Sequence, residues 1–543
     1  MKRHTYIYIC IVALMTMVSC YEDKGNYEYI ELEEVRIDTA GTGMQSEYAI
    51  MRYDTLRIKP NIYFEGQLVN DPEDAPLDYM WTIYSATTGV GTNREIDTIG
   101  YRPMLDTVIT RLGGNYYVQL AVTNRHDNIR QFFRTQVSVS EIFDGGWMVF
   151  YERADQPGYS DLALIYNEWV KANSKKNRIY LNLYSTNNGE PLPGTPVRCL
   201  DIAVSLTSGN NYIGLCTDKT LVGVSENGFE RALGFSDFFY QAPATEAPVW
   251  YGQHGSGVMS GQNSEILINN GQIYTNTYSF SATEGRTTKF GVAKNAEEEI
   301  GELAAWNAEV PHTLNYGVVV YDQTFQCFRY AGYNSARLER FGAQDLTVAA
   351  FDVNNTGMTM LMSDWGKGAS SGVSLLPHDY SIMAKDNSRY LAVTNFSSSS
   401  PTDSNLGVAL YDLTRKCPGI TAATSMAASH VGSYIYYASG NKVYKYAYDG
   451  RGMATAAWTA KNANEQVTCV RIMKYYHGTI YGYGMVPSSD NLVHIATWNE
   501  ETQEGHLYQY KINSASGALI TTSCYDYVIP GKVKDMAWKF SMQ

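Results

Sequence analysis

The chain has 543 residues, and its 55 acidic residues outnumber its 42 lysines and arginines, giving a formal net charge of −13 at pH 7. This acidic balance argues against a nucleic-acid-binding protein, which would present a basic face. The composition, 44% hydrophobic and 18% charged, is that of a globular protein. The chain is too long for one ordinary core, so we expect two or more domains or a repeat architecture.

The first predicted element is a secretory signal peptide over residues 1–19. Lys2 and Arg3 give it a positive start, and the apolar run 5–18 is shorter than the roughly 20 residues that a membrane-spanning helix needs. The small residue Ser19 then precedes Cys20, as at a cleavage site. An ordinary signal peptide followed by a chance cysteine is the alternative interpretation.

The segment Met17-Val18-Ser19-Cys20 resembles the lipobox of bacterial lipoproteins, although Met17 stands where leucine is more usual. This resemblance implies that the chain is cut before Cys20 and that the Cys20 thiol carries lipid. Two or three acyl chains anchor a protein stably, whereas a single chain is marginal. We therefore expect contact with a membrane through the lipid anchor only.

Residues 20–26 form a predicted acidic tether. Glu22 and Asp23 resemble the surface-export signal of Bacteroidetes lipoproteins; alternatively, they only keep the tether solvated. The longer string SCYEDKGNYEY, residues 19–29, resembles the start of the PKD-like family of Bacteroidetes lipoproteins. That resemblance implies an outer-membrane location facing the cell exterior. It also implies a TonB-dependent importer of the starch-utilisation-system type, with its companion lipoproteins, as partners.

Residues 27–143 are predicted to form an immunoglobulin-like or PKD-like β-sandwich. Segments 55–64, 77–85 and 115–124 alternate apolar and polar residues, as half-buried strands do. Strands at regular spacing over about 110 residues are typical of a small sandwich. The Y-x-W of Tyr79 and Trp81 resembles PKD or immunoglobulin-like modules, which implies that Trp81 fills the core.

Residues 144–543 are predicted to form a β-propeller. A hairpin is expected over 264–279, where Asn270-Gly271 supplies the turn, and another over 434–450. Strings of the form V-x-x-Y-D-x-T-x-x-C start at Val318 and Val408, an offset of 90 residues that would match two blades of about 45. The string VYKYAYD at residue 443 similarly echoes LYQYKIN at residue 507. We expect six to eight blades, with seven the best estimate; a row of stacked sandwiches is the alternative.

No motif in the chain indicates catalysis, a metal site or a cofactor. Residues 368–372 match G-x-S-x-G, but a nucleophile elbow needs that motif between a strand and a helix, so we interpret the match as chance. A pair of catalytic carboxylates would be assembled by the fold and cannot be picked from the sequence. The cysteines beyond Cys20 are scattered without a C-x-x-C pair, which favours buried thiols over a zinc cluster or a disulfide frame.

Two glycine-rich segments, 249–264 and 362–372, are the predicted ligand surfaces. Glycine lets the backbone approach a ligand, and exposed tryptophan or tyrosine offers a flat apolar face. The alternative is that each tryptophan is buried against a neighbouring blade. The candidate ligand-binding residues are Trp250, Tyr251, His254, Asp364 and Trp365.

Three functions are compatible with these features. The first is a non-enzymatic surface lipoprotein that captures an oligomeric nutrient, glycan or peptide, and passes it to a TonB-dependent importer. The second is a surface glycosidase or lyase on a propeller, which only the fold permits. The third is a structural subunit that docks onto the importer without binding a ligand.

Overall fold

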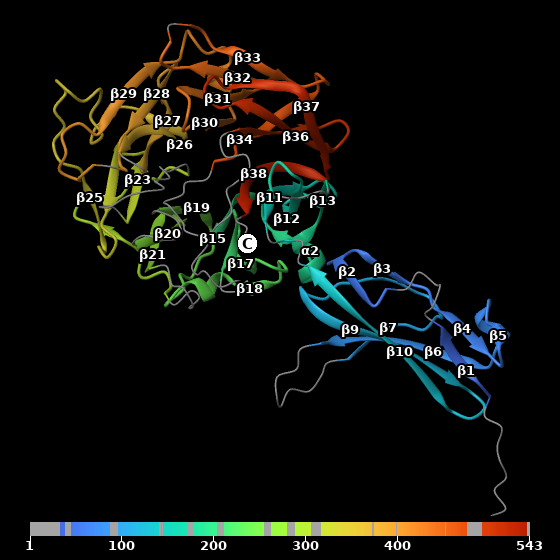
Figure 1. The fold of residues 1–543 in the computed structure, drawn as a ribbon. Coiled ribbons are helices and arrows are strands. Elements are labelled where there is room, and N and C mark those ends of the chain that lie inside the picture. The colour runs from blue at the N-terminus through green and yellow to red at the C-terminus, as the bar shows by residue number, and fades with distance from the viewer. Residues whose placement is uncertain are drawn as a thin grey trace, which may run out of the picture. The chain divides into compact units, whose positions relative to one another are not determined.

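The computed structural model describes residues 33–38, 45–86, 96–140, 143, 145–171, 177–202, 211–254, 262–279, 288–305, 317–371, 374–397, 399–450, 452–474 and 491–539. Its contacts divide the chain into two units, Met1–Glu141 and Ile142–Gln543. Both are built almost entirely from strands (Figure 1), so the all-β expectation is confirmed. Phe143 packs edge-on against Tyr180 and Phe229 and therefore belongs to the second unit.

The first unit has the small sheets of a β-sandwich. The strands are β1 (Val35–Asp38), β2 (Glu47–Met51), β3 (Thr55–Ile58), β4 (Asn61–Phe64), β5 (Gln67–Leu68), β6 (Leu77–Ser85), β7 (Asp97–Gly100), β8 (Leu105–Val108), β9 (Gly114–Asn124) and β10 (Arg130–Ser140). Five of them form a sheet in the order β2-β10-β9-β6-β7, and the others form the sheets β1-β4-β5 and β3-β8. Trp81 is fully buried in the core, and its indole N–H donates to the carbonyl of Arg102 at 2.8 Å.

The described residues of the second unit form seven sheets, which we number as blades 1 to 7. Blade 1 contains β38 (Gly531–Lys539), β11 (Gly146–Arg153), β12 (Tyr159–Tyr166) and β13 (Arg178–Tyr180), with β14 (Leu192–Pro193) beside β12; blade 2 contains β15 (Pro196–Ile202), β16 (Tyr212–Thr217), β17 (Leu221–Ser225) and β18 (Arg231–Leu233); blade 3 contains β19 (Pro248–His254), β20 (Gln262–Asn269) and β21 (Gln272–Ser279). Blade 4 contains β22 (Asn295–Ala296), β23 (Val318–Asp322), β24 (Cys327–Ala331) and β25 (Arg337–Arg340); blade 5 contains β26 (Thr359–Ser371), β27 (Ser374–Lys385), β28 (Ser388–Thr394) and β29 (Gly407–Asp412). Blade 6 contains β30 (Ser425–Ala428), β31 (Tyr434–Ser439), β32 (Lys442–Ala447) and β33 (Thr455–Thr459); blade 7 contains β34 (Glu465–Ile472), β35 (Leu492–Asn499), β36 (Glu504–Asn513) and β37 (Ala518–Ile529).

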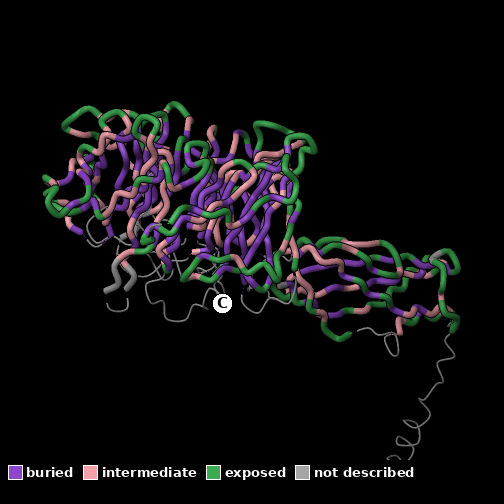
Figure 2. The backbone as a smooth tube through the Cα atoms, turned by 90° about the horizontal axis from the view of Figure 1, so that it is seen from above, coloured by how far each residue is buried: buried purple, intermediate pink, exposed green. Residues whose placement is uncertain are grey.

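The seven blades close into a ring (Figure 1), as the propeller prediction requires. Closure depends on β38, the last strand of the chain, which pairs antiparallel with β11, so that Trp147 lies opposite Trp538. The innermost strands of neighbouring blades contact one another around the centre: β34 contacts β38, β38 contacts β15, and β15 contacts β19. Figure 2 shows buried residues running through the blades, with exposed residues at their edges. The short helix α2 (Leu183–Asn188) lies between β13 and β14 along the chain, within the segment that forms blade 1.

Local signals explain several elements and correct others. Asn270 and Gly271 both have positive φ values, 49° and 72°, and join β20 to β21 in the predicted hairpin. The two V-x-x-Y-D strings do not occupy equivalent places. In blade 4, Leu303 forms an antiparallel bridge with Asp322 at the inner edge, so β23 is the second layer of the blade, counted from the centre. In blade 5, β29 is the outermost strand. The 90-residue offset is therefore not a two-blade repeat, although the seven-blade estimate is confirmed.

Of the cysteines in the described chain, Cys524 is exposed, and the rest are buried and unpaired.

Candidate functional site

The predicted lipid and export residues cannot be placed, since Cys20, Glu22 and Asp23 lie outside the described residues. Within the described residues, no helix is long and apolar enough to cross a membrane. The same part of the chain contains no group of three or more histidine, cysteine or acidic side chains that could hold a metal ion.

Trp250 and Tyr251 do not form an exposed loop, which corrects the sequence prediction. Both lie in β19, with 2% and 0% of their surface exposed. The Trp250 ring packs with Ile266 and Ile268 in the cluster shared by blades 3 and 4. It also covers Gly252 so closely that a Cβ there would lie 1.9 Å from the ring. The side chain of His254, at the end of β19, is outside the described part of the structure.

Asp364 and Trp365 lie side by side in β26, not in a glycine-rich turn, and both are half-buried. Lys474 holds them together: its Nζ is 2.6 Å from Asp364 Oδ2 and 4.5 Å from the centre of the Trp365 ring. Asp364 also accepts the backbone N–H of Ala428 at 2.8 Å. The innermost strands of the blades surround the central channel of the propeller. Because Ala428 ends β30 and Lys474 follows the end of β34, this cluster lies at the end of the channel where those innermost strands finish.

The opposite end of the channel contains a cavity of about 480 Å³, which we call the channel pocket. It lies where the innermost strands begin, and six blades contribute to it. The lining residues are the cations Arg198, Lys532 and Lys534, the polar residues Thr424, Gln466 and Thr468, and the apolar residues Pro196, Val197, Val249, Trp250, Ala305 and Val467. Of the residues predicted from the sequence, only Trp250 lines this pocket.

Repeated β-bulges shape the wall of the channel pocket. In blades 2, 3, 7 and 1 the register between the innermost strand and its neighbour shifts by one residue near the start of the innermost strand. The residues skipped by these shifts are Val197, Val249, Thr468 and Lys534, and all of them line the pocket. Since a bulge re-aims the extra side chain and bends its strand, the same irregularity in several blades builds one wall.

The cations of the pocket differ in how they are paired. Arg198 Nε lies 3.4 Å from Asp535, whose carboxylate also accepts from Arg471 at 2.9 Å and from the Cys199 backbone N–H at 3.0 Å. Among the described residues, the ammonium groups of Lys532 and Lys534 have no hydrogen-bond or ion-pair partner, although the backbone of β38 pairs with β11. Burial lowers the pKa of Lys534, and the charge of Lys532 lowers it further, against an opposing effect of Glu152.

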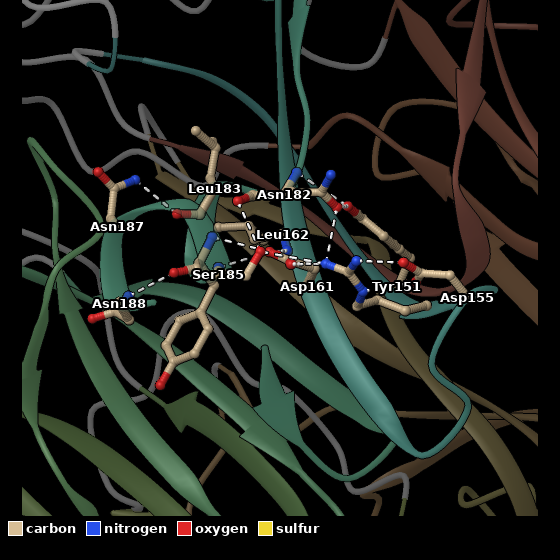
Figure 3. A network of polar contacts seen from close by, with 11 residues as sticks. Tyr151, Asp155, Asp161, Leu162, Asn182, Leu183, Ser185, Asn187 and Asn188 are labelled. Carbon is tan, nitrogen blue, oxygen red and sulfur yellow. Dashed lines mark hydrogen bonds and ion pairs between the residues drawn. The ribbon is translucent and has the colours of Figure 1, made fainter. Parts of the chain in front are cut away.

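A second charged region, shown in Figure 3, has a structural explanation. We call it the Asp161 network. The buried Asp161 carboxylate accepts the backbone N–H groups of Tyr184 and Ser185 in the first turn of α2, at 3.0 and 3.2 Å. It also accepts Arg153 Nη1 at 2.9 Å, while Arg153 Nη2 bonds Asp155 at 2.6 Å. These contacts fix α2 against β12.

Sequence reasoning missed Lys532 and Lys534. The signal available was G-K-V-K-D, residues 531–535, in which two lysines alternate with a valine that is buried in the strand β38. On its own that pattern describes a half-solvated strand as well as a site.

Comparison with known proteins supports the family resemblance of the N-terminal part of the chain. The model of the PKD-like family matches residues 20–196. No curated protein sequence matches the chain. Among solved structures, a quinonprotein alcohol dehydrogenase-like protein from Bacteroides thetaiotaomicron is similar, with 12% identity over 94% of this chain and 99% of that chain and a TM-score of 0.43. Sqt1 from Saccharomyces cerevisiae has 10% identity over 73% of this chain and 89% of its own, with a TM-score of 0.38.

Proposed function

We propose that this protein is a non-enzymatic lipoprotein of the outer-membrane surface that captures an oligomeric nutrient and passes it to a TonB-dependent importer. The observation that carries capture is the channel pocket, a cavity of about 480 Å³ lined from six blades. Its volume falls in the usual range for small-molecule sites, about 300–1,000 Å³. The match of residues 20–196 to the PKD-like family supports the sequence resemblance from which the anchor and the importer follow.

Capture is favoured over hydrolysis by the side chains that the pocket offers. Glycosidases of the usual kind need two carboxyl groups at the scissile bond, one of them protonated. The described residues that line the channel pocket include no aspartate or glutamate. A propeller-type glycosidase or lyase remains the alternative that an activity assay on oligosaccharides would support.

The location is tested on the protein in its native membrane. Mass spectrometry of the mature N-terminus should find Cys20 as the first residue, carrying lipid. Protease added to intact cells should remove the protein from their surface. In the variant with Glu22→Ala and Asp23→Ala, the protein should stay lipidated but become protected. A mature chain that starts elsewhere without lipid would overturn the proposal, and equal cleavage of both forms would reduce the acidic pair to a solvated tether.

The partner is tested by affinity purification of the full chain from detergent-solubilised outer membranes. We expect the TonB-dependent importer and its companion lipoproteins to co-purify. Growth on the captured oligomer should slow when the gene is deleted, because transfer to the importer is lost. Co-purification by a chain that binds no oligomer would favour the docking-subunit function instead.

A further inference from the structure

We infer that the channel pocket recognises an acidic oligosaccharide and holds its carboxylate or sulfate groups with Lys532 and Lys534. This inference rests on the proposed capture function and adds the class of substrate. It comes from four features of the pocket: its charge, the absence of partners for two lysines, the aim of its side chains and its uncharged donors and acceptors.

The charge of the pocket is opposite to that of the protein. The chain carries a net charge of −13, yet the pocket is lined by Arg198, Lys532 and Lys534 with no acidic side chain among its described residues. Two carboxylates interact electrostatically with these lysines: Glu152 acts on Lys534, and the pKa of Glu500 is lowered mainly by its hydrogen bond from Trp498 and in smaller part by Lys532. Neither carboxylate forms an ion pair with a lysine among the described residues, so both ammonium groups are available to an anion.

Two half-buried lysines without partners carry a cost. Burial disfavours the charged form of an ammonium group, and a like charge nearby disfavours it further. The lowered pKa of Lys534 has both causes, in that order. A bound carboxylate or sulfate would offset this cost through charge-assisted hydrogen bonds, which are stronger than neutral ones. Arg198 shows the contrast inside the same pocket, because its charge is already paired with Asp535 at 3.4 Å.

The backbone aims this charge into the cavity. Lys534 is the residue skipped where β38 shifts register against β11, between Phe150 and Tyr151. The equivalent bulges in blades 2, 3 and 7 place Val197, Val249 and Thr468 in the same wall. Of these four bulged residues, Lys534 is therefore charged, whereas the other three are apolar or carry a hydroxyl group. A single charged position in an otherwise uncharged wall points to recognition of a charged substituent on a larger molecule.

The remaining polar groups favour a sugar over a peptide. The hydroxyls of Thr424 and Thr468 donate to backbone carbonyls at 3.2 and 3.4 Å, so their oxygens remain able to accept from sugar hydroxyls. Gln466 both donates and accepts, and the buried indole N–H of Trp250 has no partner among the described residues. An extended peptide would add to a regular strand edge, but bulges interrupt the channel-facing edges here.

The test is calorimetric binding by the full chain, purified in a non-ionic detergent. The probes are oligogalacturonate, which carries carboxylates, sulfated dextran oligomers, neutral dextran oligomers and oligoglutamate. We expect one or both acidic glycans to bind, neutral dextran not to bind, and rising salt to weaken binding. The comparison of oligogalacturonate with sulfated dextran then identifies carboxylate or sulfate as the preferred group.

The decisive variant is Lys532→Met with Lys534→Met, which keeps side-chain length and removes both charges. Loss of two charge-assisted contacts should weaken acidic glycan binding about a hundredfold. The matched control, Lys289→Met with Lys385→Met, removes two exposed lysines outside the pocket and should bind as the wild type does. Unchanged affinity of the pocket variant, equal binding of neutral dextran, no binding of either acidic glycan, or binding of oligoglutamate as tight as that of the acidic glycans would each overturn the inference.

Failure of this inference can be told from failure of the proposed function. A lipidated chain that co-purifies with the importer, but whose pocket variant binds normally, removes only the inference. Lysine-dependent glycan binding by a chain that carries no lipid leaves the inference standing and removes the proposed location.

Discussion

The Asp161 network and the channel pocket use similar side chains in the same propeller, yet they differ in whether each charge has a partner. In the network, one buried carboxylate accepts from Arg153 and from two backbone N–H groups of α2. In the pocket, Lys532 and Lys534 have no ion pair with any described residue, while Arg198 beside them is paired with Asp535.

This difference separates charges that hold the fold from charges that are available to a ligand. A buried charge with all its hydrogen bonds made is costly to disturb, because removing one partner leaves the other uncompensated. A half-buried charge without a partner weakens the fold slightly and gains only when an anion arrives. The comparison therefore predicts opposite effects of substitution on stability in the two regions.

The largest effect is expected for Asp161→Ala. The side chain is fully buried, and its loss would remove the acceptor shared by Arg153, which is only 17% exposed, and the first turn of α2. We expect the free energy of unfolding to fall by about 3–5 kcal/mol, measured by urea denaturation. Asp155 bonds the same arginine but is 68% exposed, so Asp155→Ala should cost no more than about 1 kcal/mol. Equal costs for the two variants would contradict the structural role of Asp161.

A smaller effect is expected for Gly252→Ala, which tests the apolar wall of the pocket. The added Cβ would lie 1.9 Å from the Trp250 ring, so the indole must move. Overpacking of this kind costs about 1–3 kcal/mol and would also disturb the pocket that Trp250 lines. Gly291 has no atom within 4 Å of an added Cβ, so Gly291→Ala is the matched control in the same unfolding experiment. A stable Gly252→Ala variant would show that Trp250 is free to swing outward, as an exposed platform would.

Local sequence patterns predicted the elements whose causes are local. The alternation in 77–85 is the strand β6, with Trp81 in the core, and Asn270-Gly271 supplies the positive φ values of the β20–β21 turn. The echo between residues 443 and 507 is structural as well, since β32 and β36 are each the third strand of their blades. The strings at 318 and 408 are not, because short Tyr-Asp strand endings recur on strands of different rank.

The site depended on causes that are not local. Pairing of β38 with β11 brings Lys534 into one wall with Val197 and Val249, and a register shift in the innermost strands of blades 1, 2 and 3 brings these side chains to the pocket. A bulge leaves no clear mark on the alternation of a short strand, so neither the pairing nor the shift could be anticipated. The exposed role predicted for Trp250 failed for a related reason: Gly252 makes room for the ring within the sheet and does not open a loop.

The stability of the variant with Lys532→Met and Lys534→Met tests whether these two charges help to hold the fold. Removing the charges of Lys532 and Lys534 breaks no side-chain hydrogen bond or ion pair with a described residue, and it relieves the repulsion that helps lower the pKa of Lys534. The melting temperature of Lys532→Met with Lys534→Met, measured by scanning calorimetry, should therefore equal or slightly exceed that of the wild type. The double variant at Lys289 and Lys385 gives the baseline for losing two surface charges. A clear drop below that baseline would place the lysines with the structural charges of the Asp161 network.

A small, pH-dependent effect is expected for His506 in β36, a paired charge that is partly exposed. Its Nδ1 lies 2.9 Å from Asp526 and its Nε2 3.0 Å from Glu504. Burial lowers the pKa of His506, but these two carboxylates outweigh burial and raise the pKa above 6.5. A histidine whose folded pKa is raised contributes stability below its unfolded pKa, about 6.5, and loses that contribution as pH rises through the folded value. The melting temperature of His506→Gln should therefore lie below that of the wild type at about pH 5.5 and approach it at about pH 9. Because the ring is partly exposed, the gap should be smaller than that of Asp161→Ala and should narrow in salt. A gap that is constant or widens with pH would show that His506 acts through packing and not through its charge.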